Sequence, residues 1–247
     1  MTETVEVAAG IHLVHGSDTN WVMVTEGSAV TLVDSGYPRD RAQLLRALAE
    51  IGRWPEDVAA VLLTHAHSDH LGSAEFLHRT YGTPVLAHAR EVPHARREFL
   101  HQVSLGRVLA NAWRPGVLPW AVRALRAGGK SETPVSKPRS LPGEAGPLDL
   151  PGRPVPVATP GHTDGHCAFF LPQAGVLVTG DALMTAHPTA PRRGPQLLPA
   201  MFDTDRAMAL ESLSALERLD ADVLLPGHGP VHRGSAREAV ATARERA

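Results

Sequence analysis

The sequence Thr64-His65-Ala66-His67-Ser68-Asp69-His70 places three histidines and one aspartate within six residues. These residues follow the apolar run 58–64, which we interpret as a buried strand. Because a loop that leaves a strand end can point alternate side chains the same way, His65 and His67 are expected to share one metal ion. Asp69 and His70 face a different direction and suit a second ion. Imidazole nitrogen and carboxylate oxygen both bind zinc, so the stretch predicts a metal site.

Further histidines and an aspartate follow other predicted strands. The three motifs are Gly161-His162 after the run 155–159, Gly180-Asp181 after 176–179, and Gly227-His228 after 223–225. In α/β folds, ligands bind at the carboxyl ends of the strands. The motifs from both halves of the chain therefore predict one common site.

Short apolar runs and longer runs with helical spacing alternate along most of the chain, which predicts an α/β fold. We expect a single domain over 1–247, because the polar motifs of the two halves need one another. In the helix predicted at 203–219, Met208, Leu210, Leu213 and Leu216 are expected to face inward. The strands are expected at 11–15, 21–25, 29–34, 58–64, 84–88, 155–159, 167–171, 176–179 and 223–225, and the helices at 38–51, 71–81, 203–219 and 235–247.

Residues 91–150 interrupt this alternation. The first part, 91–130, has helical apolar spacing that is broken at Pro115-Gly116, and the rest is rich in Pro and Gly. Between Arg107 and Lys130 there are five basic residues and no acidic one. Two interpretations stay open: a helical and loop insertion with a solvated basic face, or a lid over the active site that contacts an anionic or apolar substrate.

Composition sets the class of protein. The net charge of the 247-residue chain is -2 with neutral histidines, so we expect neither nucleic acid nor a membrane as a partner, but a small-molecule substrate. The sequence has no signal-peptide pattern and no apolar run long enough to span a bilayer, which favours a cytoplasmic protein. The single cysteine, Cys167, lies in an apolar run, and we expect a small buried residue. The oligomeric state stays open.

The order HxHxDH, GHTxGH, GD and PGHG resembles the metallo-β-lactamase superfamily, and within it the glyoxalase II-like hydrolases, over about 11–231. The resemblance implies an α/β fold, the four-layer αββα metallo-β-lactamase sandwich with a helical insertion. It also implies that Asp34 supports the metal loop through hydrogen bonds and that His166 is structural. By the same resemblance, one metal is held by His65, His67 and His162, the other by Asp69, His70 and His228, and Asp181 bridges the two.

This set of ligands implies a binuclear zinc centre with two Zn²⁺ per chain, and iron or manganese would accept the same donors. A metal-bridged hydroxide would then attack the substrate, while Asp69 acts as a catalytic residue that orients the nucleophile or relays a proton. Seven protein ligands leave positions open for water and substrate, whereas a structural zinc site needs only four ligands. The pattern therefore favours an enzyme, a metallo-hydrolase.

The favoured substrate contains an ester, thioester or lactone-like bond. Asp181 stands where true metallo-β-lactamases carry cysteine or serine, so β-lactam hydrolysis is expected at a low level. Met184 stands where quorum-sensing lactonases carry a tyrosine, and few residues follow His228, so we do not expect the glutathione-binding domain of glyoxalase II. The alternatives are a phosphodiesterase, a mononuclear iron oxygenase resembling the persulfide dioxygenases, and a metal-binding regulatory module without turnover.

Four side chains outside the motifs are candidates for substrate contact. Arg192 and Arg193 lie in a Pro-rich loop after Asp181 and could grip a carboxylate or phosphate, or lie in solvent. His187 lies in the same loop. Trp113, like Trp120, is expected either to line an apolar pocket in the insertion or to belong to the core.

Overall fold

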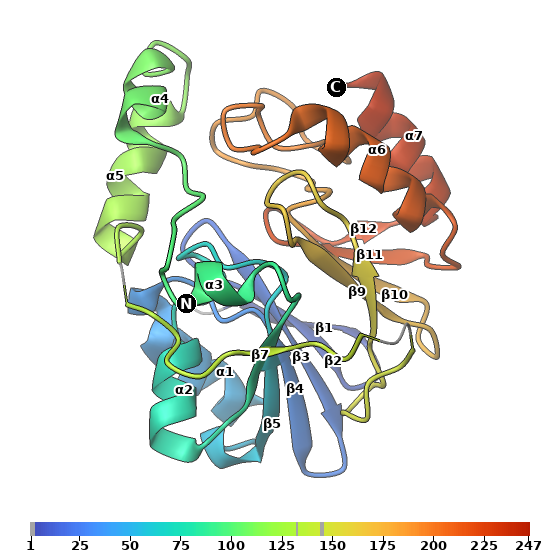
Figure 1. The fold of residues 1–247 in the computed structure, drawn as a ribbon. Coiled ribbons are helices and arrows are strands. Elements are labelled where there is room, and N and C mark those ends of the chain that lie inside the picture. Colours follow the sequence, from blue (N-terminus) through green and yellow to red (C-terminus); the bar gives the residue numbers. More distant parts are fainter. Residues whose placement is uncertain (1–2, 132, 144–145) are drawn as a thin grey trace.

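The computed structural model describes residues 3–131, 133–143 and 146–247 and contains two β-sheets between two layers of helices (Figure 1). This is the four-layer αββα arrangement that the resemblance implied. The first sheet has the order β1 (Glu3–Ala8), β2 (Ile11–His15), β3 (Asn20–Glu26), β4 (Ala29–Val33), β5 (Val58–Leu62), β6 (Val85–Ala87) and β7 (Arg139–Ser140). The second has the order β12 (His232–Arg233), β11 (Val223–Pro226), β10 (Val176–Gly180), β9 (Cys167–Leu171) and β8 (Val155–Ala158).

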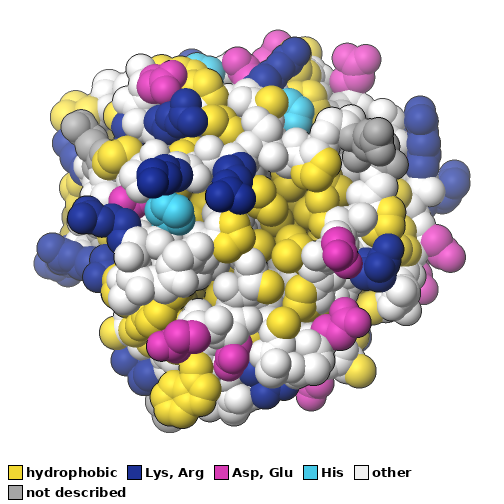
Figure 2. Space-filling model, turned by 60° about the horizontal axis from the view of Figure 1, so that its bottom comes forward, with side chains coloured by type: hydrophobic (Ala, Val, Ile, Leu, Met, Phe, Trp, Pro, Cys, Tyr) yellow, Lys and Arg dark blue, Asp and Glu magenta, His cyan; other side chains and the backbone are white. Residues whose placement is uncertain are grey.

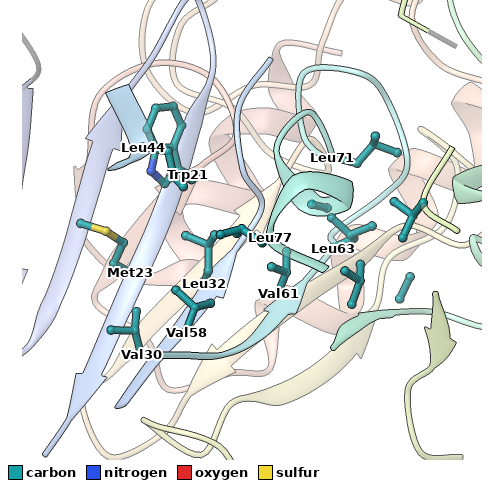
Figure 3. Packing of buried hydrophobic residues seen from close by; sticks show 14 of the residues in the cluster. Trp21, Met23, Val30, Leu32, Leu44, Val58, Val61, Leu63, Leu71 and Leu77 are labelled. Atoms are coloured by element: carbon teal, nitrogen blue, oxygen red, sulfur yellow. The ribbon is translucent and has the colours of Figure 1, made fainter. Parts of the chain in front are cut away.

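Helices α1 and α2 pack on the outer face of the first sheet, because side chains alternate between the two faces of each strand. Trp21 and Met23 of β3 point toward the helices, where they join Leu44 of α1 and Leu77 of α2 in one buried cluster (Figure 3). These helices span Arg41–Glu50 and Ala74–Tyr81, and the short 3-10 helices η1 (Pro38–Asp40) and η2 (Pro55–Asp57) lie before α1 and β5.

The space between the sheets is filled by the alternate side chains of the same strands. Val22 and Val24 of β3 share a buried cluster with Leu62 of β5 and with Phe169 and Val178 of the second sheet. Helices α6 (Arg206–Glu217) and α7 (Ala236–Glu245) cover the outer face of the second sheet. Three buried clusters thus separate the four layers.

The site lies where strand ends of the two sheets meet. Strands β4 and β5 are parallel, as are β10 and β11, so the carboxyl ends within each pair point to one edge. Two backbone hydrogen bonds join the sheets at this edge: Asn20 N donates to Gly227 O at 2.8 Å, and Cys167 N donates to Thr64 O at 2.9 Å. The loops that carry the polar motifs are therefore held together by the backbone.

The described residues of the insertion, 91–131, 133–143 and 146–150, form three helices, α3 (Val92–Ala95), α4 (Leu105–Ala110) and α5 (Val117–Ala127), and the predicted break at Pro115-Gly116 separates α4 from α5. Val117 and Trp120 of α5 pack in a buried cluster with Val108 of α4 and with Met201, which lies in the segment before α6. The insertion is thus packed against the second half of the chain. No helix in the described ranges has the length and apolar character needed to cross a membrane.

Two details differ from the sequence prediction. Strand β1 was not predicted, since its alternation covers only the four residues 4–7 at the edge of the sheet. Met208 is 37% exposed rather than inward, because the buried side of α6 is set by Ala209, Leu213 and Leu216, and Met208 lies beside that stripe. Cys167 is buried as predicted, and burial raises the pKa of its thiol to about 12.

We expect Gly72→Ala to destabilise the protein by about 3 kcal/mol, because the chain after β4 lies against this glycine. A Cβ at Gly72 would lie 2.2 Å from the carbonyl carbon of Tyr37, 2.3 Å from the nitrogen of Pro38 and 2.4 Å from the oxygen of Gly36. Urea unfolding measures the loss. Gly143→Ala is the matched control, with nothing within 4 Å of its Cβ, and should stay within about 0.5 kcal/mol of wild type. Equal stabilities of the two variants would contradict the packing.

Candidate metal centre

The seven side chains predicted to bind metal lie at the ends of four strands and form two groups. His65, His67, His162 and Asp181 form the first group, and Asp69, His70 and His228 form the second. Within each group the ligand atoms all lie within 4.8 Å of one another. All are buried except Asp69, whose side chain is 17% exposed. These are the same two sets that the resemblance implied, with Asp181 in the first.

Asp181 lies between the two groups. Its Oδ2 is 3.3 Å from His162 Nε2 and 3.3 Å from His228 Nε2, and its Oδ1 is 3.4 Å from His70 Nε2. Asp181 Oδ1 and His70 Nε2 are buried without a hydrogen-bond partner. Buried polar atoms are nearly always satisfied, so this pair of donor atoms fits a cation that both could bind.

In three of the five histidines, the outer ring nitrogen contacts oxygen from a distant segment. His70 Nδ1 donates to Asp34 Oδ2 at 2.8 Å, His228 Nδ1 donates to Asp18 O at 2.6 Å, and His67 Nε2 donates to the carbonyl of His101. The proton on that nitrogen leaves the opposite nitrogen with its lone pair directed into the site. Such outer contacts set the tautomer and orientation of metal-binding histidines.

In the remaining two histidines, the outer ring nitrogen also lies near a side-chain oxygen. Thr64 Oγ1 donates to Asp34 Oδ2 at 2.8 Å, so its oxygen accepts from His65 Nδ1 at 3.0 Å. His162 Nδ1 lies 3.4 Å from Asp203 Oδ1. Asp34 has a left-handed backbone with φ of 61° and accepts from both Thr64 and His70. Asp34 thus supports two ligand side chains at once.

The charges around the site also suit a cation. Burial, together with the charges of the neighbouring imidazoles, holds the pKa of His65 well below its usual range, and burial followed by the charge of His162 does the same for the pKa of His67. Both rings are therefore neutral, which is the form that binds metal. Burial lowers the pKa of His70, but the charges of Asp181, Asp34 and Asp69 outweigh it and raise this pKa to about 10, so these carboxylates favour positive charge at His70. A bound cation would take the place of the second ring proton, because metal binding releases protons from its ligands.

His166 lies behind Asp181 and belongs to neither group of ligands. Its Nε2 accepts from the backbone N–H of Asp181 at 3.0 Å, so its Nδ1 donates to Thr159 Oγ1 at 2.8 Å. Burial, followed by the charge of His162, lowers the pKa of His166 to about 3 and keeps the ring neutral. His166 therefore positions Asp181 through the backbone.

Glu91 is a buried support of the metal loop that the sequence did not single out. Its Oε2 accepts from Ala66 N at 2.8 Å and from His94 Nδ1 at 3.0 Å, and its Oε1 accepts from Gly165 N at 3.1 Å. Glu91 thus joins the first metal motif to the second. Nothing in the sequence distinguishes Glu91 from a glutamate on the surface, and the same holds for Asp18 and Asp203.

A cavity of about 160 Å³ lies beside the metal centre. Asp69 and Asp181 line its polar side, whereas helices α4 and α5 supply an apolar wall that includes Val108, Trp120 and Leu125. Trp120 therefore lies at the cavity. Trp113 does not line it, because its side chain lies on the surface with 82% exposure.

The two arginines proposed for substrate contact lie elsewhere. Arg192 and Arg193 line a second cavity of about 410 Å³, together with Asp18 and Asn20. His187 lines both cavities, and its ring centroid is 4.9 Å from that of His228. Of the candidates for substrate contact, His187 is thus the one that lies beside the metal centre.

Comparisons with known proteins identify the family of the chain. The sequence model described as the metallo-beta-lactamase superfamily matches residues 16–228. The probable metallo-hydrolase YflN of Bacillus subtilis (strain 168) is 28% identical over 242 residues, which cover 91% of this chain and 85% of that protein. Metallo-beta-lactamase domain-containing protein 1 of Xenopus laevis is 31% identical over 215 residues, covering 86% of this chain and 71% of that one.

A solved structure has the same fold. The metallo-beta-lactamase family protein TTHA1429 from Thermus thermophilus matches with a TM-score of 0.68 and 26% identity, over 96% of this chain and 79% of that chain. The metallo-beta-lactamase of Cronobacter sakazakii matches with a TM-score of 0.70 at 17% identity, which supports the fold alone.

We expect Glu91→Gln to lower the free energy of unfolding by about 3 kcal/mol at pH 7. Both carboxylate oxygens accept backbone N–H groups, so one of them would face the amide NH₂ of glutamine. Burial raises the pKa of Glu91, but the hydrogen bond and charge of His94, with the hydrogen bond from Ala66 N, outweigh it and lower this pKa to about 2.

The pKa of Glu91 in the folded protein lies below its ordinary value of 4.5. The ionised carboxylate therefore contributes fully to the free energy of unfolding above about pH 4.5, and this contribution is lost as the pH falls toward 2. Urea unfolding of wild type and Glu91→Gln from pH 7 to pH 3, with chelator in both, should show a difference that narrows at acid pH. A difference independent of pH would refute the assigned charge. The control is Glu56→Gln, which changes an exposed glutamate of the 3-10 helix η2 before β5.

Proposed function

Because the chain belongs to the metallo-β-lactamase superfamily, we propose that it is a metal-dependent hydrolase that holds two zinc ions and cleaves an ester, thioester or lactone bond in a small molecule. The observation that carries this proposal is the position of Asp181. Its Oδ2 lies 3.3 Å from His162 Nε2 of the first group and 3.3 Å from His228 Nε2 of the second, and its Oδ1 lies 3.4 Å from His70 Nε2 of the second. A carboxylate in that position suits a bridge between two ions.

In this proposal, His65, His67, His162 and Asp181 would hold one ion, and Asp69, His70 and His228 would hold the other, with Asp181 between the two groups. The bound ions would supply Lewis acidity and a water of lowered pKa, the chemistry that hydrolases of this kind need at neutral pH. The residues of the chain then orient the substrate, keep bulk water away and handle the proton.

Asp69 is suited to handle the proton. Its side chain is 17% exposed, and it lines the cavity. Its Oδ2 lies 3.8 Å from His70 Nε2 and 3.7 Å from His228 Nε2. Asp69 can therefore accept a proton from the attacking water and pass it to the leaving group within the same cavity.

His187 is suited to donate a hydrogen bond to the substrate. Burial, followed by the charge of His228, holds the pKa of His187 well below its usual range, so the ring is neutral. The backbone N–H of Thr189 donates to His187 Nδ1 at 3.3 Å, which places the proton on Nε2. Since His187 lines the cavity, this N–H can stabilise negative charge that develops on a substrate oxygen.

Protein purified without added metal is expected to contain about two zinc ions per chain and to lose hydrolysis of thioesters or lactones on chelation. Mass spectrometry gives the metal content, and a panel of thioester, lactone, phosphodiester and β-lactam substrates gives the activity. Asp181→Asn should lower both metal content and activity. The matched control, Asp164→Asn, changes an exposed aspartate two residues after His162 and should leave both unchanged.

Two results would redirect the proposal. About one iron per chain with oxygen uptake on a persulfide would place the protein with the oxygenases. Hydrolysis of the phosphodiester alone would retain the metal centre and change the substrate class.

We expect His187→Phe to lower kcat about 100-fold while metal content stays unchanged, because phenylalanine keeps the ring packing and removes the N–H. Steady-state kinetics on the best substrate of the panel measure this, and kcat should fall more than KM rises, because the interaction strengthens in the transition state. His12→Phe, on β2 outside the two groups of ligands and the two cavities, is the control. Unchanged kcat in His187→Phe would remove this residue from the mechanism.

A further inference from the structure

Helix α4 carries a stripe of exposed apolar side chains. Leu105 and Leu109 are 60% and 61% exposed, and Trp113, four residues further on, is 82% exposed. Leu105 and Leu109 lie on the same side of α4 because they are four residues apart, and Trp113 lies in the turn after the helix. Large apolar side chains gathered on a surface mark a site of contact with another molecule.

Helix α5 carries a second stripe. Leu118, Val122 and Leu125 are 52%, 46% and 51% exposed, while Val117 and Trp120 on the same helix are buried. The helix is therefore apolar on both its buried and its exposed side. A soluble helix normally places polar residues on its outer side, so the outer side of α5 is suited to an apolar environment.

The charge of this segment is basic throughout. Residues 107–130 contain five basic residues and no acidic one. Arg107 and Arg123 contact Met201 O and Asp18 Oδ2 within the chain, and Arg126 and Lys130 are exposed. The net charge of -2 averages over regions of both signs, and Figure 2 shows basic and acidic side chains on the same face.

Both stripes reach the cavity beside the metal centre. Leu105 of α4 and Leu125 of α5 are more than half exposed, and both also line that cavity, as does Lys130. Figure 1 shows α4 and α5 as an arm at the edge of the molecule, beside the two sheets. The exposed apolar surface is thus continuous with the wall of the candidate active site.

We propose that the α4–α5 arm, residues 105–130, docks on an anionic lipid surface. Leu109, Trp113, Leu118 and Val122 enter the interface, and the exposed basic residues contact the lipid phosphates. Apolar side chains beside Lys and Arg are the pattern of helices that lie in a membrane interface. A second copy of the chain seated on the same surface would bring two sets of basic side chains together, which disfavours a dimer through this arm.

This inference goes beyond the proposed hydrolysis and differs from the expectation of no membrane contact. That expectation used the charge of the whole chain, whereas lipid binding depends on the local charge and the exposed apolar area. Docking would place the mouth of the cavity at the lipid surface. Because binding is measured without turnover, its failure leaves the hydrolase proposal intact.

The test is co-sedimentation of the metal-loaded protein with phosphatidylcholine vesicles that contain or lack phosphatidylglycerol. We expect binding about 30-fold tighter to the anionic vesicles, and weaker binding at high salt. The variant Trp113→Ser/Leu118→Ser should lose binding at least tenfold. Its matched control, Trp54→Ser, changes a tryptophan that is 70% exposed and lies before β5.

The same co-sedimentation assay tests the contribution of the basic side chains of the arm. Arg126→Glu on α5 should weaken binding to the anionic vesicles, whereas Arg218→Glu, exposed after α6, should not. Circular dichroism confirms that each variant is folded. Absence of vesicle binding, binding equal for neutral and anionic vesicles, or equal loss in Trp54→Ser would each overturn the proposal. So would a dimer of the wild type that Trp113→Ser/Leu118→Ser dissociates without any vesicle binding.

Discussion

Five imidazoles and several carboxylates must share one buried edge of the two sheets, and the rest of the structure depends on keeping them there. Burying an ionised carboxylate is costly unless opposite charge or hydrogen bonds surround it. Asp34 meets this condition through Thr64 and His70, but one oxygen of Asp181 and one nitrogen of His70 are buried without a hydrogen bond. A bound cation would satisfy both atoms, so metal binding and folding stability are coupled at this site.

The orientation of the ligands is distributed over the whole chain. The ring of His228 is oriented by a hydrogen bond to the carbonyl of Asp18. The ring of His67 is oriented by a hydrogen bond to the carbonyl of His101, which lies in the first part of the insertion. His101 is in turn joined through His94 to Glu91, which also holds the metal loop. The beginning of the insertion therefore supports the first metal motif directly. These contacts explain why the site needs residues from segments far apart in sequence.

The later part of the insertion determines the surroundings of the site. Trp120 and Val108 form a wall of the cavity, while Leu109 and Trp113 on the same segment face outward. One short helical arm thus presents apolar side chains both to the candidate active site and to the exterior. A substrate with an apolar part would meet apolar side chains of this arm both outside the cavity and along the wall that α4 and α5 form within it.

The sequence by itself determined the alternation of strands and helices and the positions of the polar motifs, because both depend on local patterns: an apolar run forms a strand, and the residues after it lie at the strand end. The four-layer arrangement of these elements was expected from the family resemblance and not from local patterns. Tertiary structure alone decided that Glu91 is a buried support and not a surface charge, and that Trp120 lies at the cavity while Trp113 lies on the surface. The physical reason is that hydrogen-bond partners and burial are set by segments that pack together from distant parts of the chain, and no local periodicity records which segments these are.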